Sequence, residues 1–421
     1  MRALEVLDSR GFPTVRTWVE LDDGSIGVAT VPSGLAHVPD EACELRDRDS
    51  KRFGGRGVLQ AVANVNGPIS HFLSGRSLDD PNELDRELIQ FDGTPSKSRL
   101  GANSILGVSM AMRVAAAQSR SISLHRMLSH DEPIRIPVPM VNILNGGIHA
   151  DTRLRVQEVM VVPVGAKDFH EAIRMSVEIF YALKEDLRSR SLGTGVGDEG
   201  GFAPNLANPE SALEIVTEAI VHAGFTPGAE ISVAIDMAAD WLGTSELGYD
   251  LGNGPIDRDS LLKLYEKWAD AYPLVAIEDG FAYEDVDGFR DLFESLGHRM
   301  LVVGDDLFTT NPVRLDDQNL LGAANAAIIK LNQIGTVTEA IDAVDVCRAK
   351  RMATIVSHRS GDSEDTFIAD FAVAMRSEFI KTGSVTRSER TAKYNRLLEI
   401  ESDASNHASF GLSLTDLYSN Q

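Results

Sequence analysis

The feature that most constrains this chain is a series of short apolar runs in its second half, each ending in charged side chains. The runs end at Asp236, at Glu278 and Asp279, at Asp305 and Asp306, at Lys330, at His358 and Arg359, and at Lys381. Successive ends are separated by roughly 23 to 42 residues, which leaves room for one crossover helix between parallel strands. A parallel strand buried on both faces carries charge only at its end. In a barrel these ends meet at one mouth, so the pattern predicts an active site there.

Two earlier apolar runs, 140–147 and 159–165, bring the number of expected strands to eight. Helices are expected near 167–190 and 209–224, between the second and third of these strands. Eight strands predict an α/β fold, a TIM-type (β/α)8 barrel. The acidic residue Glu158 lies at the start of its strand rather than at its end. If Glu158 is functional, this second strand must be reversed relative to the others.

The first third of the chain has a different pattern. Segments 14–21 and 25–33 alternate apolar and polar residues around an Asp-Asp-Gly turn, which indicates a β-hairpin. Helical patterns follow at about 58–75, 80–91 and 101–128. Three prolines, Pro133, Pro137 and Pro139, then interrupt the pattern. We therefore expect an α+β N-terminal cap domain over residues 1–130 and a barrel domain with the active site over residues 131–421.

The bulk composition limits the classes of partner. A net charge of −23 over 421 residues, with no basic stretch, argues against nucleic acid. An anionic substrate then needs local cations at its site. Two cysteines, Cys43 and Cys347, fit a reducing compartment, and neither a secretory signal nor an apolar stretch of about 20 residues is visible. We expect a cytoplasmic protein that does not enter a membrane.

A glycine-rich segment, 195–205, contains a G-x-G-x-x-G spacing. A dinucleotide site is a poor interpretation, because no apolar strand precedes the segment and Asp198 and Glu199 would face a pyrophosphate. A glycine-bent loop that carries Glu199 into a cavity is the better interpretation. A purely structural turn is the alternative.

The strand-end residues also suggest specific chemistry. Asp236, Glu278 and Asp305 offer hard oxygen ligands of the type that Mg²⁺ takes, although acidic residues also occur at ordinary helix starts. Lys330 becomes a base only if burial or neighbouring cations lower its pKa, and a lysine at a strand end is otherwise a solvent-reaching cap.

Several motifs together resemble one family, the enolases. They are DSRG with PTV (8–15), VNILNGG-x-HA (141–150), QE-x-M (157–160), GVGDEGGFAPN (195–205), AIDMAA (234–239), IEDG (277–280), GDDLF-x-TN (304–311), IIKLNQIGT (328–336), SHRSGDSED (357–365) and KTGS-x-x-RSER (381–390). They occur in order from about residue 5 to about residue 405. The resemblance implies an α+β cap, a barrel with its second strand reversed, and at least a homodimer or higher homo-oligomer.

The resemblance also implies a role for each matched residue. Asp236, Glu278 and Asp305 would hold Mg²⁺, Lys330 would be the general base, and Glu199, assisted by Glu158, would protonate the leaving hydroxyl. The remaining matched residues would bind a small anionic substrate: Arg359 and Ser360 its phosphate, Lys381 its carboxylate and oxyanion, and His149, His358 and Gln157 as polar residues of the pocket. For the two histidines, proton transfer and a purely structural place in the wall both stay open.

Some positions depart from the family pattern. The lid segment 33–39 has Ala36 where enolases have a serine that helps to bind a second Mg²⁺, and Pro39 stiffens it. Phe12 replaces an asparagine, Ile148 replaces a small or polar residue, and Arg153 and Arg155 add charge near Glu158. These departures are concentrated around the lid and the pocket mouth.

We therefore expect an enolase-like hydro-lyase, a specialised paralogue that abstracts an α-proton from a phosphorylated or phosphonylated three-carbon acid. Three alternatives stay open. They are an ordinary glycolytic enolase, an enzyme like carboxyphosphonoenolpyruvate synthase from phosphonate biosynthesis, and an inactive scaffold.

Overall fold

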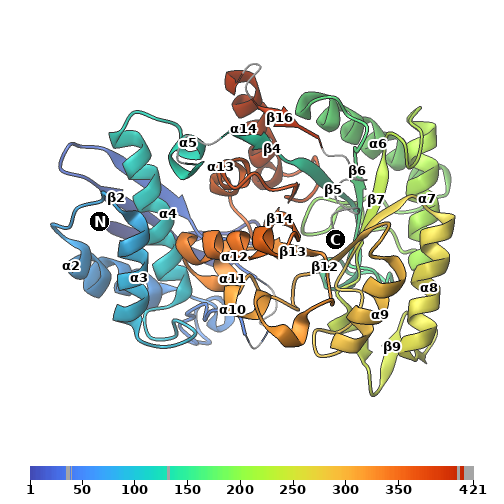
Figure 1. Ribbon diagram of the computed structural model, residues 1–421, viewed down its shortest axis with the longest axis horizontal. Coiled ribbons are helices and arrows are strands. Elements are labelled where there is room, and N and C mark those ends of the chain that lie inside the picture. The colour runs from blue at the N-terminus through green and yellow to red at the C-terminus, as the bar shows by residue number, and fades with distance from the viewer. Residues whose placement is uncertain (35–37, 39, 130–132, 405–407, 412–421) are drawn as a thin grey trace.

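The computed structural model describes the chain except for residues 35–37, 39, 130–132, 405–407 and 412–421. Elements before residue 130 lie at one end of the molecule and the barrel lies at the other (Figure 1). The predicted boundary between residues 130 and 131 falls outside the described residues.

The N-terminal part is a three-stranded antiparallel sheet covered by helices. Its strands, in the order β1-β2-β3, are β1 (Arg2–Leu7), β2 (Pro13–Glu20) and β3 (Ile26–Thr30), and its helices are α1 (Leu59–Asn64), α2 (Ser70–Leu73), α3 (Pro81–Asp92), α4 (Ala102–Ser119) and α5 (Leu124–Ser129). The hairpin of β2 and β3 confirms the predicted turn. The strand β1 was not predicted.

Two of the predicted helices are interrupted. The helix expected over 58–75 is divided by a π-helical turn, Val65–Ile69, that contains Pro68. Proline lacks the N–H of a regular turn and clashes with the preceding one, which accounts for the break. The helix expected over 101–128 ends at Ser119, and α5 starts at Leu124. Element type was therefore predictable, and element length was not.

Eight strands close into a barrel, which confirms the predicted fold class. They are β5 (Val138–Asn145), β6 (Glu158–Val162), β7 (Ser232–Asp236), β11 (Leu274–Glu278), β12 (Leu301–Gly304), β13 (Ala326–Ile329), β14 (Ala353–Ser357) and β15 (Phe379–Lys381). The second strand, β6, is antiparallel to both of its neighbours, whereas the other neighbouring pairs are parallel. The reversal puts Glu158 at the same mouth as the other strand ends.

Helices surround the barrel (Figure 1). They are α6 (Phe169–Ser189), α7 (Pro209–His222), α8 (Arg258–Ala271), α9 (Val286–Leu296), α10 (Pro312–Leu315), α11 (Leu331–Ile334), α12 (Val337–Ala349), α13 (Phe367–Ala374) and α14 (Ser388–Ala404). Short strands β8 (Gly243–Thr244), β9 (Gly248–Asp250) and β10 (Pro255–Ile256) form a small sheet beside it, and β4 (Arg135–Ile136) pairs with β16 (Ser409–Phe410). Side chains such as Met140, Leu301 and Phe379 fill the barrel interior.

Helix α4 joins the two parts. It packs on β2 and β3 with one face and meets α12 with another. The buried Arg113 forms an ion pair of 2.9 Å with Asp85 and donates to the Thr338 hydroxyl at 2.8 Å. Ser109 accepts the backbone N–H of Val337 at 3.0 Å. These polar contacts hold the N-terminal part against the barrel helix α12, so segments distant in sequence contribute to one site.

Candidate active site

The strand ends bring the predicted residues together. Asp236 and Glu278 are the last residues of β7 and β11, and Lys381 is the last of β15. Asp305, Lys330 and the pair His358 and Arg359 directly follow β12, β13 and β14. A small cavity of about 70 Å³ is lined by every predicted site residue except Glu278, which lies against Lys381.

Lys381 lies among three carboxylates. Its Nζ is 2.8 Å from Glu278 Oε2, 3.2 Å from Asp236 Oδ2 and 3.3 Å from Glu158 Oε1. Burial works to lower the pKa of Lys381, but these carboxylates outweigh it and raise the pKa well above its usual value. Lys381 is therefore an ammonium ion fixed at the centre of the mouth.

Lys330 is the second ammonium group of the mouth; its side chain is 13% exposed and pairs with Asp305. Burial is the largest single influence and acts to lower its pKa, but the ion pair with Asp305 and the charge of Glu278 act against it, and the pKa is raised. The sequence prediction needed a lowered pKa for a base at this position. In this arrangement Lys330 becomes a base only when another cation takes over Asp305.

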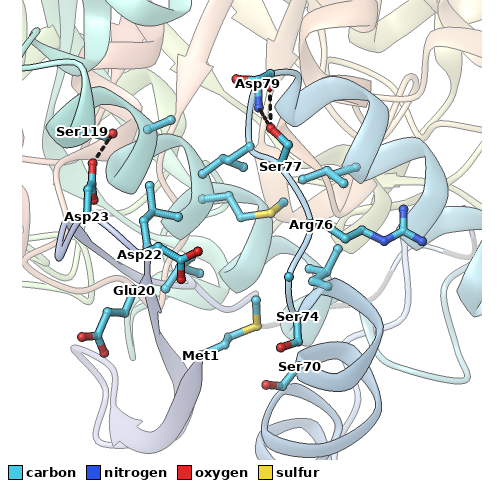
Figure 2. A pocket seen from close by; sticks show the side chains of 18 of the residues that line it. Met1, Glu20, Asp22, Asp23, Ser70, Ser74, Arg76, Ser77, Asp79 and Ser119 are labelled. Atoms are coloured by element: carbon cyan, nitrogen blue, oxygen red, sulfur yellow. Dashed lines mark hydrogen bonds between the residues drawn. The ribbon is translucent and has the colours of Figure 1, made fainter.

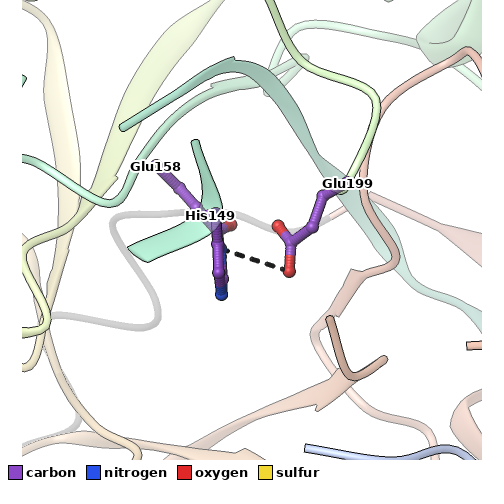
Figure 3. A group of neighbouring side chains, drawn as sticks. All are labelled: His149, Glu158 and Glu199. Carbon is purple, nitrogen blue, oxygen red and sulfur yellow. Dashed lines mark ion pairs between the residues drawn. The ribbon is translucent and has the colours of Figure 1, made fainter. Parts of the chain in front are cut away.

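On another side of the cavity, a histidine lies between two glutamates (Figure 3). His149 Nδ1 is 3.6 Å from Glu158 Oε1 and 3.5 Å from Glu199 Oε1. Burial, followed by repulsion from Glu199, raises the pKa of Glu158 to about 8. Burial lowers the pKa of His149 to about 4. The site therefore favours the protonated form of Glu158 and the neutral form of His149.

The other histidine, His358, has a defined tautomer. Arg390 Nη1 donates to its Nδ1 at 2.6 Å, and an arginine can only donate. The remaining ring hydrogen is therefore on Nε2, which lies 3.4 Å from Glu199 Oε1. Burial and the charge of Arg390 hold the pKa of His358 well below its usual value. A neutral N–H thus faces Glu199, whose other oxygen accepts from Asn142 at 2.9 Å.

Arg359 and Ser360 lie where an anionic group can be held. Arg359 Nη2 is 3.1 Å from Glu41 Oε1, and its Nη1 donates to Asn332 at 3.2 Å. Arg10 donates to the Ser360 hydroxyl at 3.1 Å. Gln157 donates to Asp236 at 3.1 Å.

Several cavity residues were not assigned a role from the sequence. Glu41 reaches the site from the N-terminal part, and Trp241 comes from the segment after β7. Asp279 and Asp306 ended predicted runs but were given no function, although Asp279 accepts the backbone N–H groups of Asp305 and Asp306 at 2.9 and 3.0 Å. A lone acidic residue such as Glu41 carries no periodic or motif signal, so sequence reasoning had no means of finding it.

The carboxylates of the mouth fit a divalent cation. Burial and the neighbouring Asp236 raise the pKa of Glu278 well above normal although Lys381 is in contact with it, because the carboxylates of the cluster outnumber the ammonium groups beside them. Its donors are hard oxygens, the type that Mg²⁺ prefers. Among the described residues, Asp279, Asp305 and Asp306 have oxygens within 4.8 Å of one another, as do the donor atoms of His149, Glu158 and Glu199. Only Asp305 of the predicted trio belongs to either group, so the predicted ligand set stays a proposal.

Two other features are separate from this site. A cavity of about 560 Å³ lies beside the end of β2, with Glu20, Asp22 and Arg76 around it, and no predicted site residue lines it (Figure 2).

The predicted lid substitution Ala36 and the stiffening Pro39 lie outside the described residues. The described Ser33 before them is bridged to Gly361 by two backbone hydrogen bonds of 2.7 and 3.0 Å.

Fold and site together define a barrel enzyme in which two ammonium groups, a carboxylate cluster and a glutamate pair surround one cavity. The family model for the enolase C-terminal TIM barrel domain matches residues 133–415, and that for the enolase N-terminal domain matches residues 1–128. The chain belongs to the enolase family. Its predicted enzyme class, a carbon–oxygen hydro-lyase, is confirmed.

Three relatives extend over nearly the whole chain. "Enolase 1" of Methylococcus capsulatus is 49% identical over 414 residues, which cover 98% of this chain and 98% of the relative. "Enolase" of Acidothermus cellulolyticus is 50% identical over 408 residues, 97% of this chain and 95% of the relative. "Enolase" of Desulfotalea psychrophila is 50% identical over 403 residues, 95% of each. In the described part of the chain, no helix is long and apolar enough to cross a membrane.

Proposed function

We propose that this protein is an ordinary enolase that uses Mg²⁺ to dehydrate 2-phosphoglycerate to phosphoenolpyruvate. The near full-length similarity to three proteins named enolase favours this function over the specialised paralogue that the lid sequence suggested. The observation that carries the proposal is the convergence on one cavity of Lys330 and Lys381 with the two glutamates Glu158 and Glu199.

Different residues of the site bind the substrate and transfer its protons. Arg359 and Ser360 bind the phosphate, and Lys381 faces the carboxylate and the negative charge that develops on it. Lys330 removes the α-proton as the C–H bond breaks. The leaving hydroxyl departs from the next carbon as water, with a proton from the pair formed by Glu199 and Glu158. The neutral His149 and His358 contribute polar contacts beside this pair.

The proposed metal ligands are Asp236, Glu278 and Asp305. Mg²⁺ held by these residues would supply positive charge that offsets the negative charge developing on the substrate carboxylate. The chain's own part is to hold the three carboxylates at the ends of adjacent strands, so that they face one mouth of the barrel. We also propose that the active form is a homo-oligomer.

Phosphorus NMR of the protein with 2-phosphoglycerate and Mg²⁺ tests the proposal. We expect conversion to phosphoenolpyruvate at roughly 1 to 1,000 per second, the usual range for enzymes. Slow or absent conversion, together with turnover of a phosphonylated three-carbon acid, would instead support the specialised enzyme. No turnover of any such acid would support the inactive scaffold.

Solvent exchange of the α-hydrogen separates the two proposed proton-transfer groups. Lys330→Met should abolish the exchange, because no base then reaches the α-carbon. Glu199→Gln should leave exchange measurable while blocking loss of the hydroxyl. Equal loss of both steps in both variants would show that these roles are wrongly assigned.

A further inference from the structure

A second cavity adjoins the catalytic one. It has a volume of about 610 Å³ and shares Ile148, Gln157, Ala238 and Trp241 with the catalytic cavity. A volume of this size accommodates a small organic molecule. A molecule that lies beside these four shared residues, just outside the catalytic cavity, therefore lies in the second cavity.

Two arginines, Arg153 and Arg155, line this second cavity. Both are exposed, whereas the residues that follow them, Leu154 and Val156, are each 1% exposed. This alternation places the two arginines on the same, outer side of the segment. Arg155 lies beside the loop between β9 and β10, since a Cβ atom on Gly252 would be 3.8 Å from its Cγ.

Among the described residues, no carboxylate forms an ion pair with either guanidinium group. Within the described part of the chain, the side chains of Arg153 and Arg155 make no ion pair or hydrogen bond, and the backbone N–H of Arg153 donates to Asn205 Oδ1 at 3.3 Å. This differs from Arg359 and Arg390, whose guanidinium groups are engaged in the site. An arginine stays protonated at every physiological pH, so both side chains offer permanent positive charge to a ligand.

The positive charge of these two arginines lies beside a cavity that otherwise repels anions. The chain has a net charge of −23, and carboxylates crowd the catalytic cavity, so a phosphorylated acid approaches against a repulsive field. Trp241, which is 53% exposed, and the buried Leu206 and Leu242 give the second cavity an apolar wall. Such low-dielectric walls strengthen the field of nearby charges and can raise association rates.

We infer that Arg153 and Arg155 form a capture site, which draws the anionic phosphorylated substrate into the second cavity before it enters the catalytic one. This inference rests on the proposed function for the identity of the substrate. The two arginines act on the rate of association and do not contact the reacting atoms.

Stopped-flow tryptophan fluorescence measures association directly, with phosphoenolpyruvate and 2-phosphoglycerate as probes and Mg²⁺ present throughout. The variant R153Q/R155Q is compared with R299Q/R376Q. Arg299 and Arg376 precede β12 and β15 and so lie at the opposite end of the barrel, and this control loses the same total charge.

We expect the association rate constant of R153Q/R155Q to fall about tenfold at an ionic strength of about 10 mM, where screening is weak, with kcat/KM falling in parallel. The control should stay within about twofold of the unmodified protein. The difference should disappear at about 0.5 M salt, because added ions screen the arginines.

Equal rate constants for the two double variants would overturn the inference. So would a loss that persists at high salt or falls equally on kcat, because that indicates altered structure. Tight binding of a nucleotide by the unmodified protein, with no effect of the arginines on phosphorylated acids, would also overturn it. If the protein binds these acids through the arginines but does not dehydrate 2-phosphoglycerate, the proposed function fails and the capture site stands.

Discussion

At the scale of single residues, the position of one proton depends on one buried arginine. Arg390 is 0% exposed in its side chain and donates to His358 Nδ1, to the carbonyls of Arg359 and Ser360 at 2.7 Å each, and to the Asp198 carbonyl at 3.2 Å. It thereby ties the loop after β14 to the glycine-rich loop that carries Glu199. The tautomer of His358 follows from this contact.

Replacing Arg390 with methionine should release the His358 ring. We expect both tautomers to become populated, so that the N–H facing Glu199 is present only part of the time. Turnover should fall by roughly 100-fold, the typical cost of a misplaced group, with a smaller change in KM. Nitrogen NMR of the imidazole reports the tautomer. Arg390→Lys, which keeps a charged donor group, should restore part of the turnover and part of the single-tautomer NMR signal. A loss of turnover with an unchanged tautomer would mean that Arg390 acts only through folding.

At the scale of elements, much of the architecture was predictable from the sequence. Apolar runs with charge only at their ends predicted the barrel. The charge of Glu158 at the start of its strand predicted a reversed β6, on the condition that Glu158 is functional. Both predictions use one rule that can be read from a short segment, namely that a buried strand carries charge only at its end. The contacts made by Glu41 and Gln333 could not be predicted this way. Gln333 donates to Glu41 at 3.1 Å and to Asp305 at 2.9 Å, and this bridge between the two parts of the chain depends on tertiary packing.

The close approach of α4 to β3 depends on the absence of a side chain at Gly27. A Cβ atom at Gly27 would lie 1.9 Å from the Ala111 carbonyl oxygen and 2.4 Å from the Ala115 nitrogen, both backbone atoms that cannot rotate away. Gly27→Ala should therefore lower the free energy of unfolding by about 1–3 kcal/mol, as overpacked sites do. Urea denaturation measures the change. Gly193→Ala is the matched control, because nothing lies within 4 Å of its added Cβ, and equal midpoints for the two variants would contradict the packing argument.

At the scale of the whole molecule, the carboxylate cluster links stability to pH and to cations. Burial, then repulsion between carboxylates, raises the pKa values of Asp279 and Asp306 well above normal, and burial with repulsion from Asp236 does the same for Glu278. The folded protein therefore keeps protons that the unfolded chain has released above a pH of about 4. Because the folded state binds more protons, stability without a divalent cation should fall as pH rises above that value.

Mg²⁺ should remove most of this pH dependence. A cation that binds only the folded protein stabilises it by about 2.7 kcal/mol at 100 times its dissociation constant, so at pH 8 millimolar Mg²⁺ should raise the melting temperature by a few degrees. The increment should shrink toward pH 5, where protons occupy the carboxylates and compete with the metal. Sodium chloride at equal ionic strength separates this effect from screening of the net charge of −23. The double variant Asp236→Asn with Glu278→Gln should lose the Mg²⁺ increment and be less sensitive to pH without the metal. If Na⁺ and Mg²⁺ stabilise equally at matched ionic strength, the effect is general screening of the net negative charge and the proposed metal ligands are wrong.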